Sequence, residues 1–156
     1  MGKILAHNLI QQELQLVKDK KILVGGCFDI LHSGHIHFLS SAKKIGGTLV
    51  VLLESDEKIK AIKGNERPVN AQKERAYLLS ALADVDYIIL LPHFTNDQEY
   101  EKLISIIQPD YFAITKDDPV NRYVKKYAQQ LNSRVVEVID RLSEYSTSKI
   151  IKQLNT

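Results

Sequence analysis

The chain has 156 residues, the size of one ordinary domain, and we expect a single domain over residues 1–156. Its 44% hydrophobic and 26% charged residues are typical of a globular protein and exclude an intrinsically disordered one. The formal net charge of +2 gives no sign of nucleic-acid binding. No apolar run approaches the roughly 20 residues of a membrane helix, and the single cysteine fits a reducing compartment. We expect a cytoplasmic protein with neither a nucleic acid nor a membrane as partner.

Residues 1–18 mix apolar and polar side chains. Apolar residues such as Ile4, Leu5, Leu9, Leu14 and Val17 are interspersed with glutamine, asparagine and glutamate. A signal peptide would need an unbroken apolar centre and a cleavage site of small residues, and the segment has neither. We therefore predict a leading amphipathic helix over 1–18, packed on the domain.

The rest of the chain alternates between two apolar patterns. Short apolar runs typical of buried strands occupy residues 22–24, 48–53, 87–91, 111–115 and 134–139. Helical spacing occupies residues 33–45, 56–63, 70–83, 97–107, 119–131 and 146–154. This alternation predicts an α/β domain with a doubly wound, parallel, five-stranded sheet. Such sheets bind ligands at the carboxyl ends of their strands.

The first predicted strand runs into the segment GGCFDILHSGH, residues 25–35. Two adjacent glycines let an anion approach the backbone closely, and the start of the next helix adds a positive dipole end. His32 and His35 are three residues apart, so their imidazoles share one helix face. Two other interpretations are a purely structural role and a zinc site, although no third Cys or His ligand lies nearby. Cys27 suits apolar packing, and Asp29 could cap or coordinate.

The same segment resembles the signature of the nucleotidyltransferase superfamily marked by H-x-G-H, in its cytidylyltransferase-like branch. The resemblance implies a Rossmann-like fold in which His32 and His35 contact the triphosphate and stabilise charge at the α-phosphorus. Gly34 would let the base or ribose approach the helix. The resemblance further assigns residues to the nucleotide site, namely Gly26, Cys27 and Phe28, and assigns Asp29 to the substrate site.

A second loop, GNERPVNAQKER, follows three lysines. Lys58 and Lys60 suit solubilising charge on an exposed helix face, whereas Lys63 and Arg67 bracket a glycine turn and could clamp an anion. The stretch from Ser55 to Asp86 resembles bacterial heptose 1-phosphate adenylyltransferase through its S-D, K-G-x-x-R-P-V-N and E-R elements. By this resemblance Lys63 is a catalytic phosphate ligand, and Arg67 and Arg75 bind substrate. Glu54 stands where that family has asparagine.

Near the end of the chain, Ser146 and Thr147 open the last predicted helix, where a hydroxyl can cap free backbone N–H groups. The segment also resembles the second superfamily signature, a basic residue followed by I-S-T-T or C-S-T-T. That resemblance makes Arg141, Ser146 and Thr147 nucleotide ligands. The capping role and the ligand role both remain open at this point.

The loop ITKDDP, residues 114–119, departs from the family. The adenylyltransferases have K-G-G-D-Y here and the glycerol 3-phosphate cytidylyltransferases M-G-D-D-W. Asp118 is retained as a nucleotide ligand, whereas Lys116 and Pro119 are not the family's residues. Lys116 could add positive charge near the acceptor or point into solvent.

These resemblances imply a nucleotidyltransferase that releases pyrophosphate and uses Mg²⁺ with the nucleotide, without a metal held by protein ligands. We expect ATP and D-glycero-D-manno-heptose 1-phosphate as substrates, giving ADP-heptose, and a possible homodimer. One alternative is a cytidylyltransferase acting on glycerol 3-phosphate or another small phosphoester; a further one is an FAD-forming adenylyltransferase. Alternatives of other classes are a non-catalytic nucleotide-binding regulator and a fragment resembling a class I tRNA synthetase. The last would need a basic face that the composition does not provide.

Overall fold

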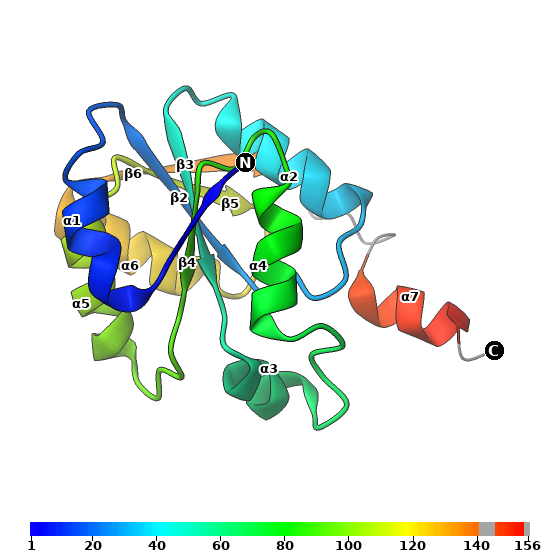
Figure 1. Cartoon of the computed structure of the whole chain (residues 1–156). Coiled ribbons are helices and arrows are strands. Elements are labelled where there is room, and N and C mark those ends of the chain that lie inside the picture. Colours follow the sequence, from blue (N-terminus) through cyan, green and yellow to red (C-terminus); the bar gives the residue numbers. More distant parts are fainter. Residues whose placement is uncertain (141–145, 155–156) are drawn as a thin grey trace.

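The computed structural model describes residues 1–140 and 146–154 (Figure 1). These residues form a six-stranded sheet in the order β1-β4-β3-β2-β5-β6, and every described pair of neighbouring strands is parallel. The strands are β1 (Lys3–Leu5), β2 (Lys21–Gly26), β3 (Thr48–Leu53), β4 (Tyr87–Leu90), β5 (Tyr111–Thr115) and β6 (Arg134–Ile139). The doubly wound α/β class is confirmed.

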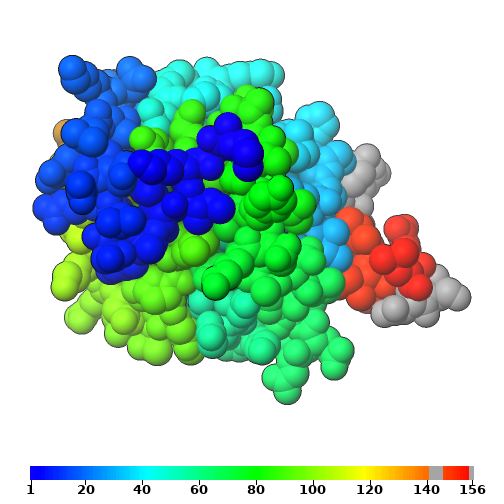
Figure 2. All heavy atoms as spheres, viewed as in Figure 1, coloured from blue at the N-terminus to red at the C-terminus, as the bar shows by residue number. Residues whose placement is uncertain are grey.

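Helices cover both faces of the sheet (Figure 1). One face carries α1 (Ile10–Leu14), α5 (Asp97–Ile107) and α6 (Asn121–Leu131), and the other carries α2 (Ser33–Lys43) and α4 (Gln72–Ser80). Three further elements are η1 (His7–Leu9), α3 (Asp56–Lys63) after β3, and α7 (Thr147–Leu154). In the space-filling view α7 projects from one side of the body, next to the segment that contains α2 (Figure 2). Among the described residues, no helix combines the length and the apolar character needed to cross a bilayer.

Alternate residues of each central strand enter two apolar cores. In β2, Leu23 packs toward the α5 side and Val24 toward the α2 side, and both are 2% exposed. Fully burying such a side chain contributes about 1.5–3 kcal/mol, which is why these strands read as continuous apolar runs. The sheet is therefore a rigid platform, and chemistry is left to the loops at its ends.

The prediction of a leading helix over 1–18 is wrong, and so is the count of five strands. Residues 3–5 form the sixth strand, which pairs with β4, and only Ile10–Leu14 is α-helical in this segment. Backbone N–H groups of Gly2 and Lys3 donate to carbonyls of the α4 end and the following turn, so the sheet edge satisfies them. Gly2 is required there, since a Cβ would lie 2.7 Å from the Val85 carbonyl oxygen. Tertiary pairing thus overrides the local helical pattern.

Most other boundaries agree with the prediction, and two helices begin later than expected. Helix α4 begins at Gln72 because Asn70 is held by Asp29, to which it donates through both its backbone and side-chain amides. Helix α6 begins at Asn121 rather than Pro119, after a turn in which the Asp118 carboxylate accepts from Val120 N–H. Both delays lie in loops that enter the candidate site.

Candidate functional site

A cleft of about 1130 Å³ lies at the carboxyl ends of the central strands. Its origin is visible in the pairing of β2, which stays with β3 up to Gly26–Leu53. Within the described residues, β2 pairs with β5 only at Ile22–Tyr111 and Leu23–Phe112, and beyond this point Val24, Gly25, Ala113 and Ile114 line the cleft. This is the point where the strand order reverses, as the doubly wound fold predicts for a ligand site.

The two imidazoles of the H-x-G-H segment meet in this cleft. The rings of His32 and His35 are stacked with centroids 3.8 Å apart and planes inclined by 22°. His32 is the N-cap residue of α2, and its carbonyl accepts from the His35 N–H, so the first turn of the helix sets the pair. Gly34 lies buried between them and lines the cleft. The expectation that both rings share one helix face is confirmed.

The environment of both histidines favours the neutral imidazole. Burial lowers the pKa of His32 below its ordinary value. Burial first, and then the neighbouring His32 and the Lys63 charge, lower the pKa of His35 to about 4. The Nδ1 atom of His35 is buried and has no hydrogen-bond partner among the described residues. An anion in the cleft would reverse these shifts, because it favours the charged imidazolium.

Phe28 and Gly26 shape the wall behind the imidazoles. Phe28 has a positive φ of 44°, uncommon for a bulky residue, and its ring centroid lies 5.2 Å from that of His35. A Cβ on Gly26 would lie 2.8 Å from the Phe28 ring, so glycine is needed for this approach. Strained backbone of this kind clusters at functional sites. Gly26, Cys27 and Phe28 all line the cleft, where burial raises the pKa of the Cys27 thiol.

Lys63 is the exposed last residue of α3 and lines the cleft. Its charge contributes to the lowered pKa of His35, so the two side chains are electrostatically coupled. Gly64, with φ of 97°, ends the helix and turns the chain away. Lys58 also lines the cleft, whereas Lys60 does not. The structure thus brings one predicted cation, Lys63, near His35, while Lys58 enters the same cleft beside Tyr100.

Asp29 and Arg67, predicted to bind substrate, are instead joined to each other. The two side chains are 1% and 8% exposed, and Arg67 Nε donates to Asp29 at 2.7 Å. Backbone N–H groups of Val69 and Asn70 donate to the same carboxylate. Burial alone would raise the pKa of Asp29, but these hydrogen bonds hold its pKa below the ordinary value. The pair fastens the first loop to the second, and neither residue is part of the cleft lining. Arg67 Nη2 is buried without a hydrogen-bond partner among the described residues, and substrate binding by this pair stays a prediction.

Arg75, also predicted to bind substrate, instead donates hydrogen bonds to the two loops that enter the site. The residue is 0% exposed, and its guanidinium lies under the loops rather than in the cleft. Its acceptors are the carbonyls of Asn70, Cys27 and Glu54 and the carboxylate of Asp56. A single guanidinium with several donors can hold several loop ends at once. Arg75 therefore positions both loops from below, and this geometry corrects its assignment as a substrate ligand.

Helix α7 closes one side of the cleft. The Ser146 hydroxyl accepts from Lys149 N–H, so it caps the helix, as the first of the two interpretations predicted. Thr147 is 7% exposed and donates to the Ile30 carbonyl at 3.4 Å. Both residues line the cleft, so capping and ligand contact are compatible. Arg141 lies outside the described residues.

The loop after β5, whose sequence differs from the family pattern, contributes Asp118 but not Lys116 to the cleft lining. Asp118 and Asn121 line the cleft, whereas Lys116 is exposed and is not part of the lining. This favours the interpretation that Lys116 points into solvent. Asn121 is 8% exposed and its amide donates to the Thr115 carbonyl, which fixes the start of α6.

Sequence reasoning missed a polar pair on the α5 side of the cleft. The Tyr100 hydroxyl donates to Glu54, 3.0 and 3.1 Å from its two carboxylate oxygens. Nearby, Tyr127 donates to Asp97 at the start of α5, and both line the cleft as well. No sequence motif signals either pair, because the two partners are 46 and 30 positions apart in the chain. The only sequence signal was that Glu54 departs from the family's asparagine.

A zinc site at the two histidines would need further ligands beside them. Among residues 1–140 and 146–154 no group of three or more His, Cys, Asp or Glu side chains is placed to hold a metal ion. Zinc sites in proteins take three or four such ligands. The histidine pair therefore does not have the geometry of a zinc centre in the described part of the chain.

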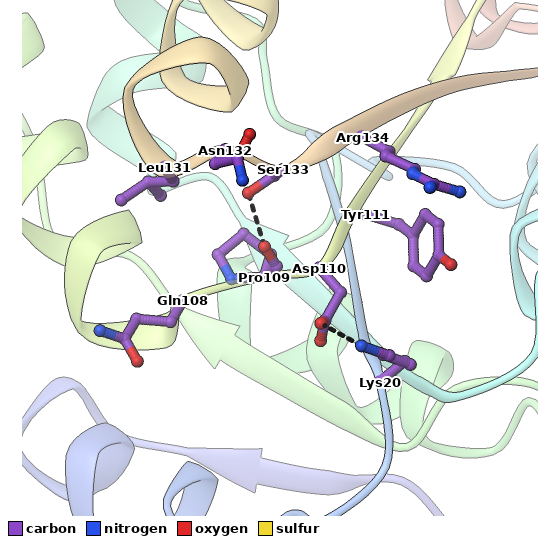
Figure 3. Close-up of a pocket in the computed structure, with 9 residues that line it drawn as sticks. All are labelled: Lys20, Gln108, Pro109, Asp110, Tyr111, Leu131, Asn132, Ser133 and Arg134. Atoms are coloured by element: carbon purple, nitrogen blue, oxygen red, sulfur yellow. Dashed lines mark hydrogen bonds and ion pairs between the residues drawn. The ribbon is translucent and has the colours of Figure 1, made fainter.

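A second pocket, of about 660 Å³, lies at the opposite, amino-terminal edge of the sheet (Figure 3). It is formed where β2 and β6 begin and where α5 and α6 end, and Lys20 and Asp110 form an ion pair there at 3.0 Å. The Ser133 hydroxyl donates to the Pro109 carbonyl at 2.6 Å. Asp110 also accepts from the Lys21 N–H, so its carboxylate is committed to the fold. No sequence-predicted site residue lies in this pocket.

Comparison with known proteins relates most of the chain to one family. The model of the family described as Cytidylyltransferase-like matches residues 23–153. Proteins named Bifunctional protein HldE are similar to the chain: 36% identical over 148 residues in a Nitratiruptor species and 38% over 152 residues in Helicobacter pylori. These matches cover 95% and 97% of this chain but only 30% and 31% of the relatives. The chain thus spans about a third of the length of these relatives.

Solved structures agree with the fold. The lipopolysaccharide core biosynthesis protein from Thermoplasma volcanium is 29% identical with a TM-score of 0.60, over 82% of this chain and 99% of that one. The pantoate-beta-alanine ligase from Francisella tularensis has a TM-score of 0.68 at 16% identity, over 95% of this chain and 69% of that one. At that identity the second likeness concerns the fold alone.

Proposed function

The chain belongs to the cytidylyltransferase-like family of nucleotidyltransferases, and from this premise we propose that it transfers an adenylyl group from ATP to D-glycero-D-manno-heptose 1-phosphate. The products are ADP-heptose and pyrophosphate. The observation that carries the proposal is the stacked pair of His32 and His35 at the N-terminus of α2, inside the cleft. The similarity to HldE proteins and the resemblance of residues 55–86 to heptose 1-phosphate adenylyltransferases support this acceptor.

The proposed reaction is a direct displacement at the α-phosphorus. A phosphate oxygen of the acceptor forms the new bond, the bond from the α-phosphorus to the bridging β-oxygen breaks, and pyrophosphate leaves with that oxygen. Positioning and charge neutralisation are sufficient for this chemistry, so no covalent enzyme intermediate is required. His32, His35 and the N–H groups that open α2 would stabilise the charge that develops in the transition state.

Lys63 would neutralise the triphosphate from the rim of the cleft. Its charge acts on His35, so a phosphate bound between the two would be attracted by Lys63 and would favour the charged imidazolium. Mg²⁺ would enter as the magnesium complex of the triphosphate and supply charge to the leaving pyrophosphate. Gly26, Phe28, Gly34, Asp118, Ser146 and Thr147 would surround the nucleotide, and the gap between β2 and β5 offers its base apolar walls. Arg141 stays a predicted nucleotide ligand.

The second candidate is a cytidylyltransferase acting on glycerol 3-phosphate or a similar phosphoester. The family description, Cytidylyltransferase-like, favours this alternative, and both reactions would use the same histidine pair. A homodimer and a cytoplasmic location stay predictions, as does the absence of nucleic acid and membrane among the partners.

Pyrophosphate release tests the proposal. The full chain would be incubated with Mg²⁺ and either ATP or CTP, across heptose 1-phosphate, glycerol 3-phosphate and FMN. We expect the fastest release with ATP and heptose 1-phosphate, and the largest rise in melting temperature with ATP, because a ligand bound only by the folded state stabilises it. A clear preference for CTP would contradict the proposed pair of ATP and heptose 1-phosphate. Thermal stabilisation by a nucleotide without release from any pair would favour a non-catalytic regulator.

A further inference from the structure

Glu54 and Tyr100 stand on the side of the cleft away from the histidines. Glu54 follows β3, and Tyr100 lies on α5, which covers the face of the sheet opposite to α2. Apart from Lys63 at the end of α3, the residues proposed for the nucleotide come from the ends of β2 and β5, from α2 and from α7. The β3 side of the same cleft is therefore left for the acceptor, and Glu54 and Tyr100 line it.

The backbone holds Glu54 firmly in this place. Its N–H donates to the Gly26 carbonyl at 3.1 Å, and its carbonyl accepts from the buried Arg75 at 2.8 Å. Tyr100 is held by packing against Phe94, with ring centroids 4.9 Å apart. The pair is thus preorganised rather than a chance contact between mobile surface chains.

The Glu54 carboxylate has acceptor capacity left over. A carboxylate offers about four lone-pair sites, and within the described residues the Tyr100 hydroxyl is the one donor that reaches it. Burial raises the pKa of Glu54, although Tyr100 and the Lys58 charge oppose this shift. A half-buried carboxylate short of donors is costly unless a ligand supplies them.

The surroundings decide which donor fits. The Lys58 ammonium lies 5.7 Å from the Tyr100 ring centroid, so a cation already occupies this aromatic face and would repel a second one. A phosphate that contacted the Glu54 carboxylate itself would be repelled by it. Neutral hydroxyl donors satisfy the carboxylate without either penalty.

We propose that Glu54 and Tyr100 bind hydroxyl groups of the acceptor's carbon skeleton, so that the enzyme selects a phosphorylated sugar or polyol and directs its phosphate toward the histidines. This inference rests on the proposed function and assigns its acceptor a chemical class. Glu54 receives the hydroxyl hydrogen bonds, and Tyr100 fixes the carboxylate in position. The Glu54 carboxylate thereby binds the hydroxyl end of the acceptor and repels its phosphate, which orients the phosphate toward the histidines.

Two variants and a set of deoxy acceptors test this inference. Glu54→Gln keeps the shape but removes the charge, and Tyr100→Phe removes only the hydroxyl. The KM values for acceptor and nucleotide are measured with the acceptor that gives the fastest pyrophosphate release and with analogues of it that lack one hydroxyl each. Glu57→Gln, on the exposed face of α3 and outside the cleft lining, is the matched control.

We expect Glu54→Gln to raise the acceptor KM about 10- to 100-fold and Tyr100→Phe less, with nucleotide KM changed little, because a hydrogen bond to a charged group is lost. The analogue that lacks the hydroxyl bound by Glu54 should be a much poorer substrate than the parent acceptor for the wild type. For Glu54→Gln, the analogue and the parent acceptor should have similar KM values, because that hydrogen bond is already lost. An unchanged acceptor KM, or the same deoxy penalty in both proteins, would overturn the inference while leaving the transferase reaction standing. Absence of pyrophosphate release with every acceptor would overturn the proposed function and this inference together.

Discussion

The two ends of the sheet carry a pocket each, and their polar groups are used in opposite ways. At the amino end Lys20 and Asp110 form an ion pair, with Arg134 beside them in the same lining (Figure 3). At the carboxyl end two imidazoles are stacked on each other and Lys63 adds its charge to His35. The comparison teaches that a pocket's volume does not make a site. What matters is whether it gathers groups that a ligand can complete, such as the buried Nδ1 of His35 and the charge of Lys63.

The largest effect should come from the group that supports the carboxyl-end loops from below. Arg75→Met leaves the carboxylate of Asp56 and three backbone carbonyls without their donor, so we expect a loss of about 3–5 kcal/mol in the free energy of unfolding. Urea unfolding measures it. Arg122→Met, at an exposed position on α6 beside Tyr123, is the control and should change stability by less than about 1 kcal/mol. Equal stability of both variants would remove Arg75 from its supporting role.

Lys63→Met should weaken transition-state binding by roughly 2–4 kcal/mol, the scale of removing one preorganised charge. The measurement is kcat/KM for the acceptor at saturating nucleotide. Lys60→Met is a suitable control, since Lys60 lies on the same helix but does not line the cleft. Full activity of the Lys63 variant would shift the anion role to Lys58, which does line it.

Replacing His32 or His35 with alanine should lower kcat by about 10²-fold or more while changing nucleotide affinity less, because the imidazoles act where charge develops. Steady-state kinetics and nucleotide titrations separate the two effects. Melting temperatures of the variants check that the loss is not unfolding. Loss of affinity with kcat intact would make these residues binding groups only.

The pKa of about 4 for His35 predicts a pH-dependent stability. The folded pKa lies below the ordinary 6.5, so the contribution is complete above about pH 6.5 and is lost as the pH falls toward 4. Partial exposure to solvent limits the effect to about 1–3 kcal/mol. Urea midpoints from about pH 7.5 to about pH 4.5 should fall less steeply in His35→Gln, which lacks the titrating ring. Parallel slopes would show that His35 is not responsible.

The smallest effect belongs to the amino end. Lys20→Met breaks an exposed ion pair and should cost about 0–1 kcal/mol of stability with unchanged kcat/KM. Assays of unfolding and of pyrophosphate release test both parts. A fall in activity matching that of the Lys63 variant would erase the distinction between the two ends.

Local sequence was sufficient where local physics dominates. The ends of β3, β5, β6, α3 and α5 fall where apolar periodicity and capping residues place them; Asn96 and Glu99, for example, form the capping box of α5. It was insufficient for residues 1–18, since an edge strand depends on a partner strand more than 80 positions away in the chain. Mixed apolar and polar spacing over so few residues cannot reveal that partner.

The sequence by itself determined the fold class and the core of the site, because H-x-G-H fixes two imidazoles on one helix turn and alternating apolar segments require a two-faced parallel sheet. Tertiary structure decided what each polar residue does. Asp29, Arg67 and Arg75 carry the charges expected of ligands, yet they are buried against each other's loops, whereas Glu54 and Tyr100 meet in the cleft across 46 positions. The reason is that charge is a property of a residue, while burial and partners are properties of its surroundings.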